Sequence, residues 1–124
     1  MTKLEFENLV FQAYACTPDR PFSDDQDVLV FRHGDNRKWF GIVMNIPRCK
    51  LGLVDPGRID IVNLKCPEQV LHTIRQEPGV FPAYHMNKAH WVSVALDGSA
   101  TDDTIRFLCE QSFRLTASKK HRQN

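Results

Sequence analysis

Apolar and polar residues at the start of the chain recur with the period of an amphipathic helix. The apolar positions fall at i, i+3, i+4 and i+7, on Phe6, Leu9, Val10 and Ala13. Thr2 and Glu5 have the spacing of a capping box, in which each side chain binds the backbone N–H of the other residue. We therefore expect a first helix from Lys3 to Cys16. The prolines and carboxylates between residues 18 and 27 then predict an exposed loop.

The next part of the chain has the composition of strands. Residues 28–64 contain four runs rich in β-branched and aromatic residues: VLVFRH, KWFGIVM, LGLV and IDIVNL. Turn-forming residues separate these runs at positions 34–36 and 55–57. Short strands joined by such turns are typical of an antiparallel meander.

Two more helices and one more strand complete the pattern. Pro67 and Glu68 predict a helix start, because proline is tolerated in a first turn and an acid favours the positive helix end. That helix should bury Val70, Leu71 and Ile74 and stop at residues 78–79, and WVSVALDG (91–98) should form a strand. Thr101 is expected to cap the last helix, which should end near Ala117. Its buried face should hold Ile105, Leu108, Cys109 and Ser112.

The expected element order is α-β(3-4)-α-β(1-2)-α, which indicates an α+β fold with two layers. An antiparallel sheet would be covered by helices on at least one face. We expect residues 1–118 to form a single domain. Residues 119–124 have no apolar side chain to bury, so we expect them to form a disordered basic tail.

Alternation along the strands places the two tryptophans. If Phe40, Ile42 and Met44 share one side of their strand, Trp39 points to the other side, and Trp91 likewise opposes Val92, Val94 and Leu96. If helices cover the aliphatic side, both tryptophans lie on an open sheet face. The alternative is that loops, the last helix or a second subunit bury them.

Composition narrows the protein class. An apolar share of 42% and a charged share of 25% are those of an average globular protein. The first residues alternate charged and apolar side chains and include no long apolar run, so we expect a cytoplasmic protein without a membrane segment. The cysteines are scattered without a Cys-x-x-Cys pair, and we expect all four to be buried thiols: Cys16, Cys49, Cys66 and Cys109.

The sequence predicts no catalytic, cofactor or metal site. His85 and His90 would need a further metal ligand, for which Cys66 or Asp97 would have to come near, so we expect both rings to bind neighbouring backbone instead. No cysteine or serine lies in a local catalytic signature, and no glycine-rich phosphate loop occurs. We therefore expect a non-enzymatic protein.

Charge gives the first indication of a ligand. The net charge is only +1, but residues 32–65 hold seven basic residues against three acidic ones. Clustered Arg and Lys can neutralise phosphates, although the same residues on hairpins are also typical of an ordinary solvated surface.

One segment resembles a known family. Residues 78–98, PGVFPAYHMNKAHWVSVALDG, contain a Tyr-His-Met-Asn-Lys-x-His-Trp run before a strand that ends Leu-Asp-Gly. This run resembles the MmcQ/YjbR-like family. Shorter segments also look like its longer members: Arg37-Lys38-Trp39-Phe40, Leu51-Gly52-Leu53, Asn63-Leu64-Lys65-Cys66 and Gln111-Ser112-Phe113. Members commonly carry Ser-Tyr where this chain has Ser112-Phe113.

The resemblance implies a fold similar to frataxin and secretion chaperones, and DNA binding through a double-wing motif. An iron-handling role like that of frataxin would need an acidic ridge on the first helix, where this chain offers only Glu5 and Glu7. The expected nucleic-acid contacts lie on the basic hairpins and in the Tyr-to-Trp run: Arg32, Arg37, Lys38, Arg48, Lys50, His85, Asn87, Lys88 and His90. Asn87 could read a base edge or brace its own loop. A module that binds a protein or peptide through Trp39 and Trp91 is the alternative. The sequence leaves the oligomeric state open.

Overall fold

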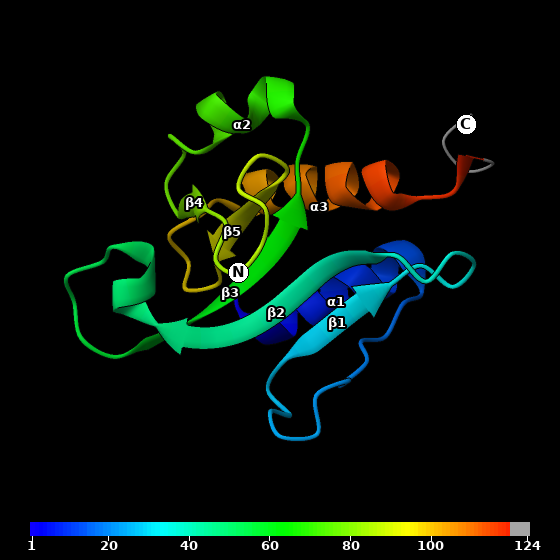
Figure 1. Ribbon diagram of the computed structural model, residues 1–124, viewed down its shortest axis with the longest axis horizontal. Helices are drawn as coiled ribbons and strands as arrows, with labels where there is room; N and C mark the ends of the chain where they lie inside the picture. Colours follow the sequence, from blue (N-terminus) through cyan, green and yellow to red (C-terminus); the bar gives the residue numbers. More distant parts are fainter. Residues whose placement is uncertain (120–124) are drawn as a thin grey trace.

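The computed structural model describes residues 1–119, whose five strands form one antiparallel sheet in the order β1-β2-β3-β5-β4. The predicted α+β class and element order are confirmed (Figure 1). The strands are β1 (Leu29–Arg32), β2 (Trp39–Pro47), β3 (Arg58–Lys65), β4 (Val80–Pro82) and β5 (Trp91–Ala95). The helices are α1 (Lys3–Tyr14), α2 (Glu68–Ile74) and α3 (Asp102–Thr116), and η1 (Arg48–Leu51) is a 3₁₀ turn. The tail predicted from residue 119 onward lies almost entirely outside the described residues.

The hydrophobic core lies between the sheet and its helices. Helices α1 and α3 lie behind the strands in Figure 1. Phe6 and Val10 of α1 pack with strand residues such as Phe31, and the α3 residues Ile105 and Leu108 are also fully buried in this cluster. The opposite side of the sheet, which we call the open face, is toward the viewer. Helix packing therefore leaves the open face to the loops.

Local capping sets the helix ends. Thr2 and Glu5 form the predicted capping box, but α1 ends at Tyr14 and not at Cys16. Ala15 adopts a left-handed conformation (φ 51°), which cannot continue the helix. Thr101 caps α3 as predicted, accepting a hydrogen bond from the Thr104 N–H at 3.1 Å. No helix in residues 1–119 combines the length and the apolar content that a bilayer crossing requires.

One strand prediction is wrong. The LGLV run forms the end of η1 and the loop after it, because Gly52 is left-handed (φ 78°) and its N–H closes the 3₁₀ turn. The structure also has the second strand that the expected order allowed before the last helix but that the sequence did not locate. This is β4, a three-residue edge strand whose Val80 pairs with Val94 of β5.

A β-bulge at the start of β2 decides which way its aromatic residues point. Phe31 pairs with Gly41 but Arg32 pairs with Trp39, so Phe40 is an extra residue without a partner. Phe40 therefore turns to the helices, where its ring meets that of Phe113 edge-on, at 5.0 Å between centroids. The prediction that Phe40 shares a side with Ile42 is wrong. Both tryptophans nevertheless lie on the open face as expected, because Trp39 and Trp91 each pack against the buried cluster that contains Ile42.

Candidate functional site: a basic-aromatic row on the open face

Four side chains from four strands line up at one end of the open face. Because the strands are antiparallel, the ends of β1 and β3 lie beside the starts of β2 and β5. Arg32 pairs with Trp39, and Lys65 pairs with Trp91. All four are half-buried and together give the order Arg32, Trp39, Lys65, Trp91 across the sheet. We call these residues the basic-aromatic row.

The Arg32 side chain is held in place from two sides. Its guanidinium carbon lies 5.6 Å from the centre of the Trp39 ring, which is cation–π geometry. Its Nε donates to Asp19 Oδ2 at 2.7 Å, and Asp19 is fixed by backbone hydrogen bonds to Val30. Asp19 also lies 3.7 Å from Arg37. The carboxylate thus orients Arg32 and offsets part of the positive charge nearby.

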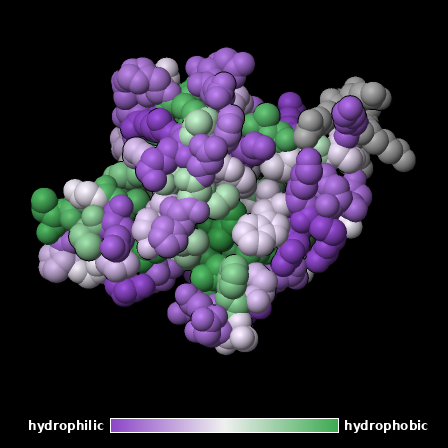
Figure 2. All heavy atoms as spheres, viewed as in Figure 1, coloured by the Kyte–Doolittle hydropathy of each residue, from purple (hydrophilic) through white to green (hydrophobic). Residues whose placement is uncertain are grey.

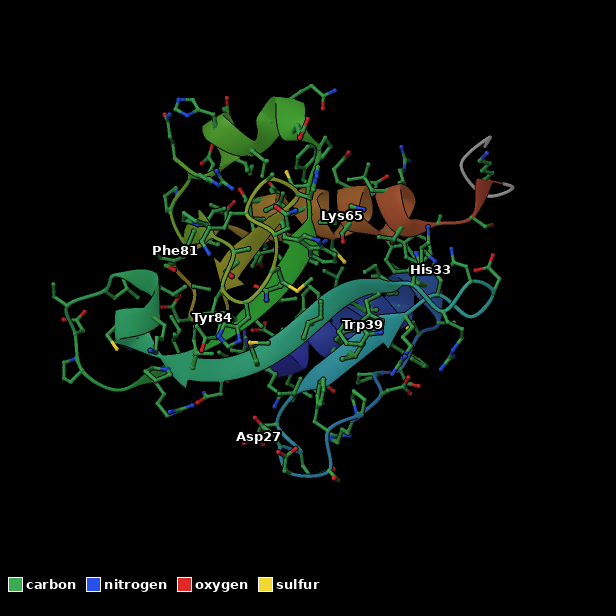
Figure 3. The ribbon with its side chains drawn as sticks, in the orientation of Figure 1. Asp27, His33, Trp39, Lys65, Phe81 and Tyr84 are labelled. Atoms are coloured by element: carbon green, nitrogen blue, oxygen red, sulfur yellow. The ribbon has the colours of Figure 1, made fainter. Side chains whose placement is uncertain are left out.

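Lys65 is the member of the row that the sequence analysis missed. Its backbone N–H donates to Ser112 Oγ at 2.8 Å, which ties the end of β3 to α3. The ion pairs found within residues 1–119 do not include Lys65. The alternation of Ile59, Ile61 and Asn63 could have placed Lys65 on the open face. In Figure 3, Trp39 and Lys65 lie toward one end of the sheet and Tyr84 toward the other.

Loop 83–90, which contains most of the family-like run, covers the middle of the open face. Asn63 Nδ2 donates to the Tyr84 carbonyl and Ser93 Oγ accepts from the Tyr84 N–H, each at 2.9 Å. Ser93 Oγ also donates to Asn63 Oδ1. Met86, farther along the loop, packs with Trp39 and Trp91. A buried polar pair therefore anchors the loop against the sheet.

The polar residues of this loop have separate roles. Asn87 Oδ1 accepts from the Ala89 N–H at 2.8 Å, so the side chain braces its own loop, which was one of the two predicted roles. His85 is left-handed (φ 59°) and its ring stacks on Tyr84 at 4.0 Å. His90 Nδ1 lies 3.9 Å from Glu68 Oε1. The rings thus have side-chain neighbours where backbone partners were expected.

The nine predicted contact residues do not lie together. Arg32, Arg37, Lys38, Lys88 and His90 lie at or near the end that holds the row. Arg48 and Lys50 lie at the other end of β2, which nine residues place about 30 Å away. There Arg48 faces Asp97 at 3.8 Å. His85 lies over the far part of the face, where it lines a cavity of about 290 Å³ with Asp25 and Arg58.

Two of the four cysteines are buried, unreactive thiols. Burial raises the pKa of the Cys66 thiol to about 11 and that of Cys109 to about 12, so both are protonated at neutral pH. The prediction that all four are buried is wrong for Cys49, which is exposed in η1, and for Cys16, which is half-buried. Within residues 1–119, no three His, Cys, Asp or Glu side chains are grouped to hold a metal ion.

Comparisons with known proteins identify the family but no activity. The family model YjbR matches residues 11–115. The chain is 39% identical over 116 residues to the uncharacterized protein YyaQ of Bacillus subtilis, covering 94% of this chain and 98% of that protein. It is also 41% identical over 54 residues to the uncharacterized protein YjbR of Escherichia coli K12, covering 43% and 46% of the two chains.

Solved structures agree with this match. A crystal structure of a Pseudomonas syringae protein superposes with a TM-score of 0.91 at 39% identity and covers 94% of this chain and 100% of its own. The Deinococcus radiodurans protein DR2400 has a TM-score of 0.71 at 23% identity, covering 98% and 86%, and shares the fold. The match over most of the length and the shared fold together show that the chain belongs to the YjbR family.

Proposed function

We propose that this protein is a non-enzymatic nucleic-acid-binding protein, with DNA as the ligand to test first, and that the basic-aromatic row is its contact surface. One observation carries the proposal: two cations and two tryptophans alternate across four neighbouring strands. Cations neutralise phosphates, and indole rings stack on bases of any sequence. Lys38 and Lys88 add two exposed cations at or near the same end.

This proposal uses only part of the contact set expected from the sequence. Two of the cations at the η1 end face a carboxylate or an amide: Arg48 faces Asp97, and Arg58 Nε donates to Asn45 Oδ1 at 2.6 Å. A surface charge that already has a partner contributes less to phosphate binding than a free one, so within the row Lys65 is the main phosphate contact and Arg32, paired with Asp19, contributes less. The two ends are also too far apart to act as one short contact.

A titration at two salt concentrations tests the proposal. Between about 50 and 200 mM salt, contact with three or four phosphates should weaken binding about 20- to 50-fold for a labelled single strand and about 40- to 150-fold for a labelled duplex. No binding in the dilute buffer would reject the proposal.

A charge-reversal pair locates the surface. Lys65→Glu should weaken binding about tenfold or more, because a charged hydrogen bond is lost and repulsion replaces it. Lys50→Glu makes the same change in net charge at the opposite end, and its affinity should stay within about twofold. An equal loss in both variants would place the contact elsewhere or spread it over the whole surface.

Binding of a protein or peptide is the second candidate, and the apolar patch of the open face favours it. The half-buried Met44 and Met86 lie with the tryptophans around the buried Val28 and Ile42. Figure 2 shows apolar surface in the middle of this face, bordered by hydrophilic residues. An apolar interface changes little with salt, so an affinity that ignores salt would favour this candidate.

A further inference from the structure

The tryptophans of the row lie where a base can reach them only if it is unpaired. Both rings are half-buried and, like Met86, pack against the buried Ile42 cluster on the sheet surface. A duplex presents base edges in its grooves and hides the flat faces of the bases inside the stack. Rings that are half-buried against the sheet cannot enter that stack. Stacking on Trp39 and Trp91 therefore requires bases that have left a duplex or never belonged to one.

The segments that border this face point the same way. Ile42, between the two ends of the open face, is only 2% exposed, although no helix within residues 1–119 packs on this side. Loop 83–90 lies over the middle of the open face. At the β1 edge of the face, Asp19 forms an isolated β-bridge with Val30, so the segment around Asp19 borders that edge. A thin, flexible strand can follow such a surface more closely than a stiff duplex.

The spacing within the row also suits an extended strand. Trp39 on β2 and Trp91 on β5 are separated by β3, so about 10 Å lies between them. Stacked bases in a helix are about 3.4 Å apart. Two bases that occupy both rings must therefore be splayed apart. Lys65, on the strand between the rings, lies where the linking phosphate would pass.

We propose that the ligand of the row is an unpaired stretch of nucleic acid, with one base stacked on Trp39, another on Trp91 and the intervening phosphate on Lys65. This inference rests on the proposed nucleic-acid binding and narrows its substrate class. Duplex binding would involve phosphates alone and would leave the rings without a role.

The chain provides its own reporter, because Trp39 and Trp91 are its only two tryptophans. Unlabelled 12-nucleotide oligothymidylate and a 12-base-pair duplex would be titrated in dilute buffer while tryptophan emission is followed. The single strand should quench the emission and bind at least about tenfold more tightly than the duplex. Dextran sulfate, a polyanion without bases, should leave the emission unchanged, and quenching by it would contradict stacking.

The outcomes separate the two proposals. If the duplex binds as tightly as the single strand or more so, the inference is wrong while nucleic-acid binding stands. If neither oligonucleotide binds in dilute buffer, the proposed function itself is rejected.

Ring variants test the contact directly. Trp39→Leu and Trp91→Leu should each weaken oligothymidylate binding about 5- to 100-fold, measured by anisotropy of a labelled strand. Trp39→Phe and Trp91→Phe keep a stacking ring and should recover most of the affinity, and their circular dichroism shows whether the fold is intact. Full affinity in both leucine variants would overturn the inference.

Discussion

Single buried polar residues decide how the open face is built. Asn63 and Ser93 are fully buried, pair across β3 and β5, and hold Tyr84 by both its carbonyl and its N–H. A buried polar group without a partner costs about 1–3 kcal/mol. These two side chains therefore stabilise the sheet only while loop 83–90 stays on it, and that requirement fixes the loop beside the row.

Removing one hydroxyl from this network should loosen the loop. Ser93→Ala leaves the Tyr84 N–H and Asn63 Oδ1 without this partner, so the free energy of unfolding should fall by about 1–3 kcal/mol in urea denaturation. Ser23→Ala, in the exposed loop before β1, should change it by less than about 0.5 kcal/mol. Equal values for the two variants would show that the network does not hold the loop.

Alanine substitutions at two glycines can distinguish the cost of backbone strain from the cost of a steric clash. Gly79 (φ 76°) and Gly98 (φ 91°) are both left-handed, so alanine at either position should cost about 1–2 kcal/mol. At Gly79 the added Cβ would also lie 2.6 Å from the Ala100 nitrogen, whereas at Gly98 it would meet nothing. Gly79→Ala should therefore be less stable than Gly98→Ala by a further 1–3 kcal/mol or so in the same assay. If both variants lost the same free energy of unfolding, the chain before β4 would be able to shift and relieve the contact between the new Cβ and Ala100.

At the scale of elements, one hydroxyl of α3 forms hydrogen bonds with two strands of the sheet. Ser112 Oγ accepts from the Lys65 N–H and donates to the Phe40 carbonyl at 2.5 Å. Phe40 is the bulge residue without a strand partner, so Ser112 satisfies a backbone group that the bulge leaves free. These two hydrogen bonds of Ser112 position Lys65 and also Phe40, the residue next to Trp39.

Ser112→Ala should therefore affect stability and the row together. The loss of two buried hydrogen bonds should lower the free energy of unfolding by about 1–3 kcal/mol. It should also shift the tryptophan emission maximum, because the bulge that orients Trp39 loses its support. Ser118→Ala, just beyond α3, should leave both quantities near their original values. An unchanged emission spectrum in Ser112→Ala would show that the bulge holds without Ser112.

Sequence patterns predict those elements whose determinants are local. Thr2 with Glu5 and Thr101 with its acidic first turn mark two helices correctly, because a cap needs only residues a few positions away. The bulge is different, since its carbonyl partner Ser112 is 72 residues from Phe40. Loop 83–90 likewise depends on Asn63, 21 residues before Tyr84. Such contacts exist only after folding.

The difference between local patterns and long-range contacts also explains which residues of the basic-aromatic row could be predicted. Arg32, Trp39 and Trp91 could be chosen by residue type, but their alignment with Lys65 depends on strand order. The basic residues between positions 32 and 65 suggested one continuous surface because they are close in sequence. Strand β2 instead carries them to opposite ends of the sheet.

For the whole molecule, the buried ionisable groups predict how stability changes with pH. Burial raises the pKa of Cys66 to about 11 and of Cys109 to about 12, both from 9.0, and that of Tyr14 to about 12 from 10.0. Above about pH 9 the unfolded chain loses protons that the folded chain keeps. The folded state then binds more protons, so stability falls as pH rises.

Alkaline unfolding should therefore begin within this window. The urea midpoint, measured with a reductant present, should be nearly constant below about pH 9 and should fall steadily from there toward pH 11. Cys109→Ala removes the thiol with the highest pKa and should make the fall shallower, whatever its effect at neutral pH. Leu108→Ala creates a cavity at the adjacent core position without removing an ionisable group, so it should lower the midpoint at every pH and keep the original slope. A slope that responds equally to both substitutions would mean that lost packing, and not thiol ionisation, governs the alkaline limit of this fold.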